Sequence, residues 1–148
     1  HNRRKADGLA HAYHPTLLDL ARAVDTLIVV VPGGEATRKA VNQEVLQALG
    51  PQGVLINIGR GSTVDEDALI AAVRGGTIAA AGLDVFENEP KIRPEFFDLP
   101  NTVLLPHVGS ASVHTRMAMG NLCVDNLVGW FSGKGAVTPV PETVHLQR

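Results

Sequence analysis

The segment Gly53-Val54-Leu55-Ile56-Asn57-Ile58-Gly59-Arg60-Gly61 combines an apolar, β-branched run with a glycine turn. Such a run predicts a strand buried on both faces, as in a parallel sheet. Asp65 and Glu66 follow the turn, and acidic residues favour the positive end of a helix dipole, so we expect a helix over residues 65–73. The segment therefore predicts the strand–turn–helix unit of an α/β fold.

The same alternation continues on both sides of this segment. Apolar runs predict further strands over residues 27–31, 77–85 and 102–105, and apolar periodicity predicts helices over residues 17–24, 42–49 and 112–130. We therefore predict a Rossmann-like doubly wound parallel sheet within residues 1–133. Residues 134–148 are expected to form an extended C-terminal tail.

Composition limits the class of protein. The chain has 148 residues, 45% hydrophobic residues and a net charge of −2, which suits one globular domain and excludes a disordered chain. Without a basic excess no nucleic-acid partner is expected, and without a long apolar run neither a membrane span nor a signal peptide is expected. The lone Cys123, on an apolar helical stripe, is expected in the core, and the cytoplasm is the expected compartment.

Polar side chains follow three of the predicted strands. Arg60 follows the strand of the first segment, Glu89 follows residues 77–85, and His107 follows residues 102–105. Glu89 can pair with one ring nitrogen of His107 and favour its protonated form, while Arg60 offers a planar fork for a carboxylate. An acid, its orienting carboxylate and a carboxylate anchor indicate chemistry on the carbonyl of a 2-oxo acid, although each residue alone also suits an ordinary turn.

Three longer segments carry a family resemblance. Residues 57–69 (NIGRGSTVDEDAL), 82–90 (GLDVFENEP) and 105–110 (LPHVGS) resemble the arginine, glutamate and histidine segments of the D-isomer-specific 2-hydroxyacid dehydrogenases. The resemblance implies that Arg60 binds the substrate carboxylate and polarises its carbonyl, that His107 gives the proton to the carbonyl oxygen, and that Glu89 pairs with His107. A nicotinamide cofactor would supply the hydride.

The resemblance also implies positions that line the cofactor, namely Val31, Pro32, Thr37, Ile58, Gly59, Asp84 and Gly109. The basic start of the chain lies where the family's second strand ends, and Asn2, Arg3 and Arg4 are candidates for the 2′-phosphate of NADP. We therefore expect NADP(H), with NAD as the alternative if this basic run is only a frayed terminus. The run also resembles the glyoxylate/hydroxypyruvate reductase branch, which implies a small 2-oxo acid as substrate. No metal site is predicted.

The sequence departs from the family in lacking a Gly-x-Gly-x-x-Gly loop and the second, substrate-binding domain. The resemblance therefore implies that residues 1–133 form a partial nucleotide-binding domain, an incomplete Rossmann-like sheet with its first βαβ unit missing. We therefore expect these 148 residues alone neither to turn over nor to hold cofactor tightly, and we expect the complete enzyme to be a homodimer. A nucleotide-sensing domain like that of the C-terminal-binding corepressors is the alternative from another class. An inactive truncated remnant is the third possibility.

Overall fold

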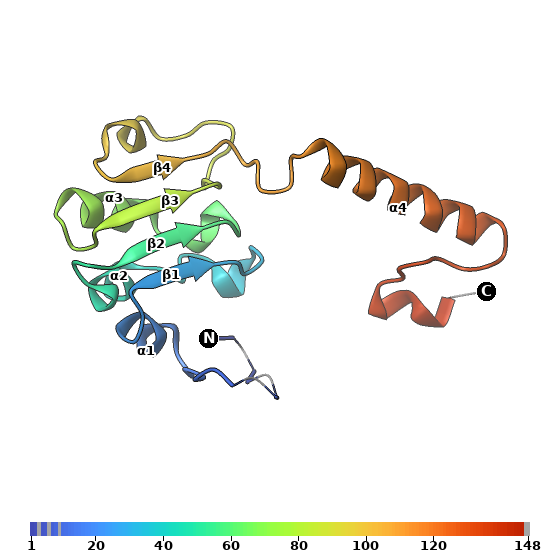
Figure 1. Cartoon of the computed structure of the whole chain (residues 1–148), viewed down its shortest axis with the longest axis horizontal. Helices are drawn as coiled ribbons and strands as arrows, with labels where there is room; N and C mark the ends of the chain where they lie inside the picture. Colours follow the sequence, from blue (N-terminus) through green and yellow to red (C-terminus); the bar gives the residue numbers. More distant parts are fainter. Residues whose placement is uncertain (3, 6, 9, 147–148) are drawn as a thin grey trace. The chain divides into compact units, whose positions relative to one another are not determined.

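The computed structural model describes residues 1–2, 4–5, 7–8 and 10–146. Four strands form one parallel sheet in the order β1-β2-β3-β4: β1 (Thr26–Val29), β2 (Val54–Asn57), β3 (Ala80–Leu83) and β4 (Thr102–Leu104) (Figure 1). The register pairs Ile28 with Ile56, and Ile56 with Gly82. The predicted Rossmann-like parallel α/β sheet is confirmed, although β3 is shorter than the apolar run over residues 77–85.

Three helices connect or precede these strands: α1 (Leu17–Arg22), α2 (Gln43–Leu49) and α3 (Glu66–Arg74). Each begins where a polar side chain caps it, at Thr16, Asn42 and Asp65 respectively, by accepting backbone N–H bonds of the first turn. Short 3-10 turns that periodicity does not predict lie at η1 (Glu35–Thr37), η2 (Gly61–Thr63) and η3 (Pro94–Asp98).

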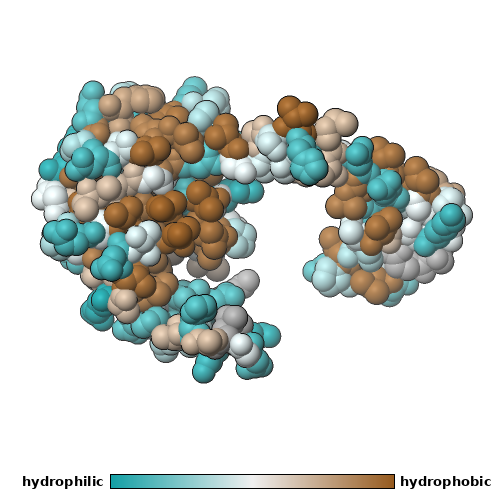
Figure 2. All heavy atoms as spheres, viewed as in Figure 1, coloured by the Kyte–Doolittle hydropathy of each residue, from teal (hydrophilic) through white to brown (hydrophobic). Residues whose placement is uncertain are grey.

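The strands alternate between buried and exposed side chains. Leu27, Leu55 and Leu83 point into a core shared with α1–α3, whereas Ile28 and Val103 on the other face are 54% and 63% exposed. Apolar side chains accordingly gather over the strands in the space-filling view (Figure 2). The expectation that the strands are buried on both faces is therefore wrong for the described part of the chain. The helices that follow β1 and β2 pack beside one another, and the core lies between these helices and one face of the sheet.

The connections at the carboxyl ends of the strands differ from those at their amino ends; these two ends form the carboxyl edge and the opposite edge of the sheet. The chain leaves the carboxyl ends of the strands through residues 30–42, 58–65 and 84–93. It returns from α2 to β2 through residues 50–53 and from α3 to β3 through residues 75–79, at the opposite edge (Figure 1). In parallel sheets of this type ligands bind at the carboxyl ends of the strands. A binding site is therefore expected among residues 30–42, 58–65 and 84–93.

The chain divides into two compact units, His1–His107 and Val108–Arg148. The boundary therefore differs from the predicted one at residue 133. The second unit contains α4 (Val113–Phe131), capped by Ser112, and η4 (Pro141–Leu146), so the tail is not extended as expected. Asn126 of α4 ties this helix to the connection that precedes η4, because its Oδ1 accepts from the N–H of Thr138 over 2.9 Å.

The apolar stripe predicted for the last helix is present but not buried. Met119, Leu122 and Leu127 are each at least 42% exposed, and Cys123 is also exposed, so its expected place in the core is wrong. Periodicity predicts the helix but not what covers it. No helix in the described part of the chain is both long and apolar enough to cross a membrane.

Candidate active site

The three predicted catalytic residues lie at the carboxyl ends of neighbouring strands. Arg60 is three residues beyond β2, Glu89 lies in the loop after β3, and His107 lies three residues beyond β4. Because the strands are parallel and adjacent, these loops emerge at one edge of the sheet (Figure 1). All three residues belong to the first compact unit.

Glu89 and His107 are in direct contact. Nδ1 of His107 lies 2.7 Å from Oε2 of Glu89, and the N–H of Phe86 donates to Oε1 of Glu89 over 2.8 Å. Partial burial raises the pKa of the Glu89 carboxyl, but the hydrogen bonds from His107 and Phe86 and the nearby charges of His107 and Arg60 outweigh it, so this pKa lies below its usual value. The carboxylate therefore fixes one edge of the imidazole and leaves Nε2 on the other.

The backbone at His107 is unusual. Its φ is +57°, in the left-handed region, which costs a residue with a Cβ about 1–2 kcal/mol. A conformation of that cost persists only where its surroundings enforce it, and such residues cluster at functional sites. Here it coincides with the turn that places the ring against Glu89. Apart from the Pro106-His107 pair, no local sequence pattern predicts this conformation.

Buried side chains brace the backbone of Arg60. Nδ2 of Asn57 and the hydroxyl of Thr63 donate to the Arg60 carbonyl over 3.0 and 2.6 Å, and Oδ1 of Asn57 accepts from the N–H of Gly59 over 3.1 Å. Asn57 and Thr63 are each only 1% exposed. The guanidinium itself donates to the Gly59 carbonyl over 2.7 Å. The bracing role of Asn57 and Thr63 is not predicted from the sequence. A polar Asn57 inside an apolar strand is the one pattern that indicates such a role.

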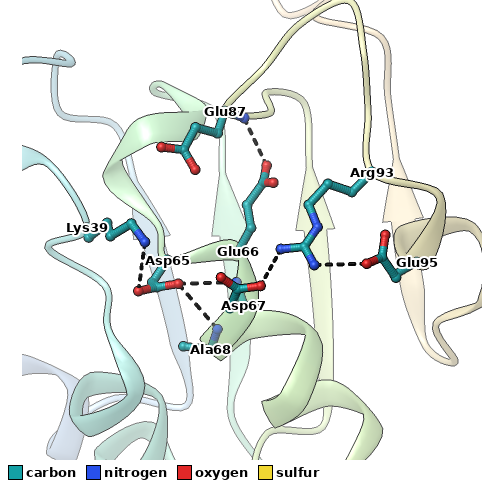
Figure 3. Close-up of polar contacts among 8 residues, drawn as sticks. All are labelled: Lys39, Asp65, Glu66, Asp67, Ala68, Glu87, Arg93 and Glu95. Atoms are coloured by element: carbon teal, nitrogen blue, oxygen red, sulfur yellow. Dashed lines mark hydrogen bonds and ion pairs between the residues drawn. The ribbon is translucent and has the colours of Figure 1, made fainter.

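A second set of contacts supports the segment that carries Glu89. Glu66 accepts from the N–H of Glu87 over 2.8 Å, and the Glu87 carboxylate accepts from Arg38 over 2.8 Å (Figure 3 shows the first of these). The arginine segment also touches this backbone at Gly61, where an added Cβ would overlap the main chain of Phe86 and Glu87. From the sequence alone Glu66 is expected only to favour the helix dipole, and Arg38 and Glu87 are not predicted as site residues.

An open depression of about 480 Å³ lies at the carboxyl ends of β1 and β2. Its lining includes Asn2, Val31, Pro32 and Thr37, all predicted cofactor positions. An adjoining depression is lined by Ile58, Gly59 and Arg60, together with the end of β1. These residues fit part of a dinucleotide, because Ile58 presents a 54% exposed apolar side chain to a flat ring and the glycines allow close approach.

The other predicted cofactor residues are placed as follows. Asp84 is buried directly after β3, and its backbone N–H donates to the carbonyl of Asn57 over 3.0 Å. Arg4 is exposed, and Arg3 lies outside the described residues. Gly109 belongs to the second compact unit.

The parallel sheet and the arginine, glutamate and histidine at its carboxyl edge define the class as a Rossmann-type α/β domain. The family model for the D-isomer specific 2-hydroxyacid dehydrogenase, NAD binding domain, matches residues 1–109. The chain therefore belongs to the D-isomer specific 2-hydroxyacid dehydrogenase family.

Within this family, the chain is similar to the following individual proteins. A crystal structure of an NADPH-dependent glyoxylate/hydroxypyruvate reductase from Sinorhizobium meliloti, in complex with NADP and malonate, is 63% identical with a TM-score of 0.91, covering 96% of this chain and 44% of that one. Glyoxylate/hydroxypyruvate reductase A HPR2 of Arabidopsis thaliana is 54% identical over 132 residues, 89% of this chain and 42% of its own length. Hydroxyphenylpyruvate reductase of Plectranthus scutellarioides is 48% identical over 139 residues, 94% of this chain and 44% of its own length. The chain thus spans less than half the length of these relatives.

Proposed function

We propose that the whole protein is an NADPH-dependent reductase of small 2-oxo acids such as glyoxylate or hydroxypyruvate, and that this chain supplies its catalytic side chains. The observation that carries the proposal is the 2.7 Å contact between Glu89 and His107, with the charge of Arg60 acting on the same carboxylate. The names of the relatives support the substrate class and the preference for NADPH.

Each residue has a separate task in this reaction. The planar fork of Arg60 binds the substrate carboxylate and draws electron density from the adjacent carbonyl. His107 holds a proton at Nε2 and gives it to the carbonyl oxygen as that oxygen gains charge, while Glu89 holds Nδ1 and stabilises the protonated ring. When bound, NADPH supplies the hydride that is added to the carbonyl carbon. The product is a 2-hydroxy acid, with one hydride and one proton added.

The cofactor would lie against the depression at the ends of β1 and β2. Val31, Pro32 and Ile58 would contact its flat rings, and Thr37, whose hydroxyl donates to the Pro32 carbonyl over 2.8 Å, would keep that turn in shape. Asp84 and Gly109 are proposed to contact the nicotinamide end. Asn2, Arg3 and Arg4 are proposed to hold the 2′-phosphate, since cations there favour NADP over NAD.

The test is the oxidation of NADPH by the whole protein with glyoxylate or hydroxypyruvate. We expect His107→Ala to lose about 100-fold or more in kcat, as loss of a general acid typically does. Arg60→Ala should raise KM as well as lower kcat, because it removes both carboxylate binding and carbonyl polarisation. Wild-type rates in His107→Ala would contradict the mechanism.

The cofactor preference is tested in the same assay. Replacing Arg3 and Arg4 with Ala should raise the KM for NADPH and leave the KM for NADH nearly unchanged. Nucleotide-dependent binding of peptides without any NADPH oxidation would instead favour the corepressor-like alternative.

A further inference from the structure

We propose that Glu66 is a positioning residue that holds the backbone carrying Glu89, and through it the Glu89–His107 pair. Its effect on rate rests on the proposed reductase function, but its effect on Glu89 does not. Glu66 lies on α3, belongs to the arginine segment and is 21 residues before the N–H that it binds.

The contact is buried and directed. Glu66 is only 6% exposed, and its Oε1 accepts from the N–H of Glu87 over 2.8 Å. In the close-up its side chain points from the start of α3 toward the main chain of Glu87, away from the ion pairs of Arg93 (Figure 3). A carboxylate is costly to bury unless it is hydrogen bonded. The hydrogen bond from the Glu87 N–H offsets this cost for Glu66.

Helix capping does not explain Glu66. Asp65 is the N-cap of α3 and already accepts from the N–H groups of Asp67 and Ala68 (Figure 3). Asp65 also pairs with Lys39 over 3.3 Å. The start of the helix is therefore satisfied by the neighbouring residue, and the Glu66 carboxylate serves the loop instead.

Two consecutive N–H groups connect Glu66 to Glu89. The N–H of Phe86 donates to Glu89, and the next N–H along the chain, that of Glu87, donates to Glu66. A rotation in this short stretch would disturb both bonds, so fixing one orients the other. Gly61 also packs directly against this backbone, since no Cβ fits between Gly61 and Phe86.

The pKa of the Glu66 carboxyl lies above its usual value. Burial raises the pKa of Glu66, the Glu87 N–H opposes that rise, the Glu87 and Asp67 carboxylates add to it, and Arg93 lowers it. The amide oxygen of a glutamine could accept the same N–H without carrying charge. An apolar side chain of similar size could not.

This difference gives the experiment. Glu66→Gln keeps the acceptor, and Glu66→Met keeps most of the volume but removes it. Glu95→Met is the matched control, because Glu95 is another carboxylate close to Arg93, and among the described contacts its side chain bonds to Arg93 and not to the N–H of Phe86 or Glu87. The Glu89 carboxyl is titrated by carbon-13 NMR in each variant, with thermal unfolding as a check of folding.

We expect the Glu89 pKa to stay low in Glu66→Gln and Glu95→Met and to return toward the ordinary glutamate value in Glu66→Met. In the whole protein, kcat of Glu66→Met should fall roughly 10- to 100-fold, since misplacing a catalytic group by about 1 Å can cost 100-fold. KM should change little, because Arg60 still binds the carboxylate. If Glu66→Met does not fold, Glu66→Asp replaces it, because its shorter side chain draws the acceptor away from Glu87.

The proposal is overturned if Glu66→Met, or Glu66→Asp in its place, leaves the Glu89 pKa low, or if Glu66→Gln or Glu95→Met raises it as much. Absence of reductase activity in the wild-type protein would contradict the proposed function alone. The titration of Glu89 would still decide the positioning role.

Discussion

Asn57 donates a hydrogen bond from Nδ2 to the carbonyl oxygen of Arg60 over 3.0 Å. Its Oδ1 accepts from the N–H of Gly59 over 3.1 Å, so one buried amide fixes the backbone on both sides of the peptide that joins Gly59 to Arg60. The amide stands at the end of β2 and is 1% exposed. Its polar atoms thus serve the turn that carries the arginine.

The first prediction follows from that amide. Asn57→Leu should lower the free energy of unfolding by about 1–3 kcal/mol, because it leaves the buried N–H of Gly59 without its partner. Urea unfolding of the chain measures this change. Asn88→Ala, at an exposed position, is the control and should change stability by less than about 0.5 kcal/mol. Equal stabilities for the two variants would contradict the bracing role.

Gly61 gives a second prediction. Gly61→Ala should destabilise the chain by about 1–3 kcal/mol or more, because its Cβ would overlap the backbone of Phe86 and Glu87. Gly120→Ala is the matched control: Gly120 lies inside α4 with nothing within 4 Å of an added Cβ. That variant should gain about 0.5–1 kcal/mol from helix propensity. Thermal unfolding should show the two changes with opposite signs, and the same sign would refute the close-approach argument.

The third prediction concerns the dependence of stability on pH. The pKa of Glu89 is lower in the folded than in the unfolded chain, so its ionised form stabilises the fold above the unfolded pKa, and this contribution is lost as the pH falls through the folded pKa. Glu89→Gln should therefore cost stability at pH 6 and progressively less below the ordinary glutamate pKa. The cost should stay below about 1 kcal/mol, because the side chain is 32% exposed. Urea unfolding across this range measures it, and a cost that grows toward low pH would contradict the sign.

The fourth prediction concerns Arg93, which donates to Asp67 over 2.6 Å and to Glu95 over 2.9 Å (Figure 3). Arg93→Ala should cost less than about 1 kcal/mol, because both carboxylates are substantially exposed, and the cost should shrink as salt is added. Lys91→Ala is the control, since the described residues show no ion pair for Lys91. Unfolding at low and high ionic strength distinguishes the two, and a salt-independent loss would mean that packing, not charge, holds Arg93.

Local patterns in the sequence predict the sheet, the helices and the edge at which Arg60, Glu89 and His107 meet. These follow from periodicity and from the parallel order of the strands. The contact between Glu66 and Glu87 could not be predicted in this way, because it joins a helix and a loop that only the folded sheet brings together. The left-handed turn at His107 also depends on tertiary surroundings.

The exposure of the apolar stripe of α4 is also not predicted from the sequence. Apolar periodicity correctly predicts a helix there, and Ser112 caps it as expected of a residue of its type. Periodicity cannot say which surface covers the stripe, so Cys123 was wrongly assigned to the core. The exposure of Ile28 and Val103 on one face of the sheet is not predicted for the same reason. A β-branched run does not reveal whether one or both faces of a strand are packed.

The return connections at residues 75–79 lie at the edge of the sheet opposite the catalytic loops. Gly76 there has a φ of +66° and open space around it. Reporter groups or short recognition sequences inserted at this turn would extend into solvent on the side away from His107, as insertions at exposed turns generally do. The fold thus provides an attachment point from which the chemistry at the other edge could be followed without being touched.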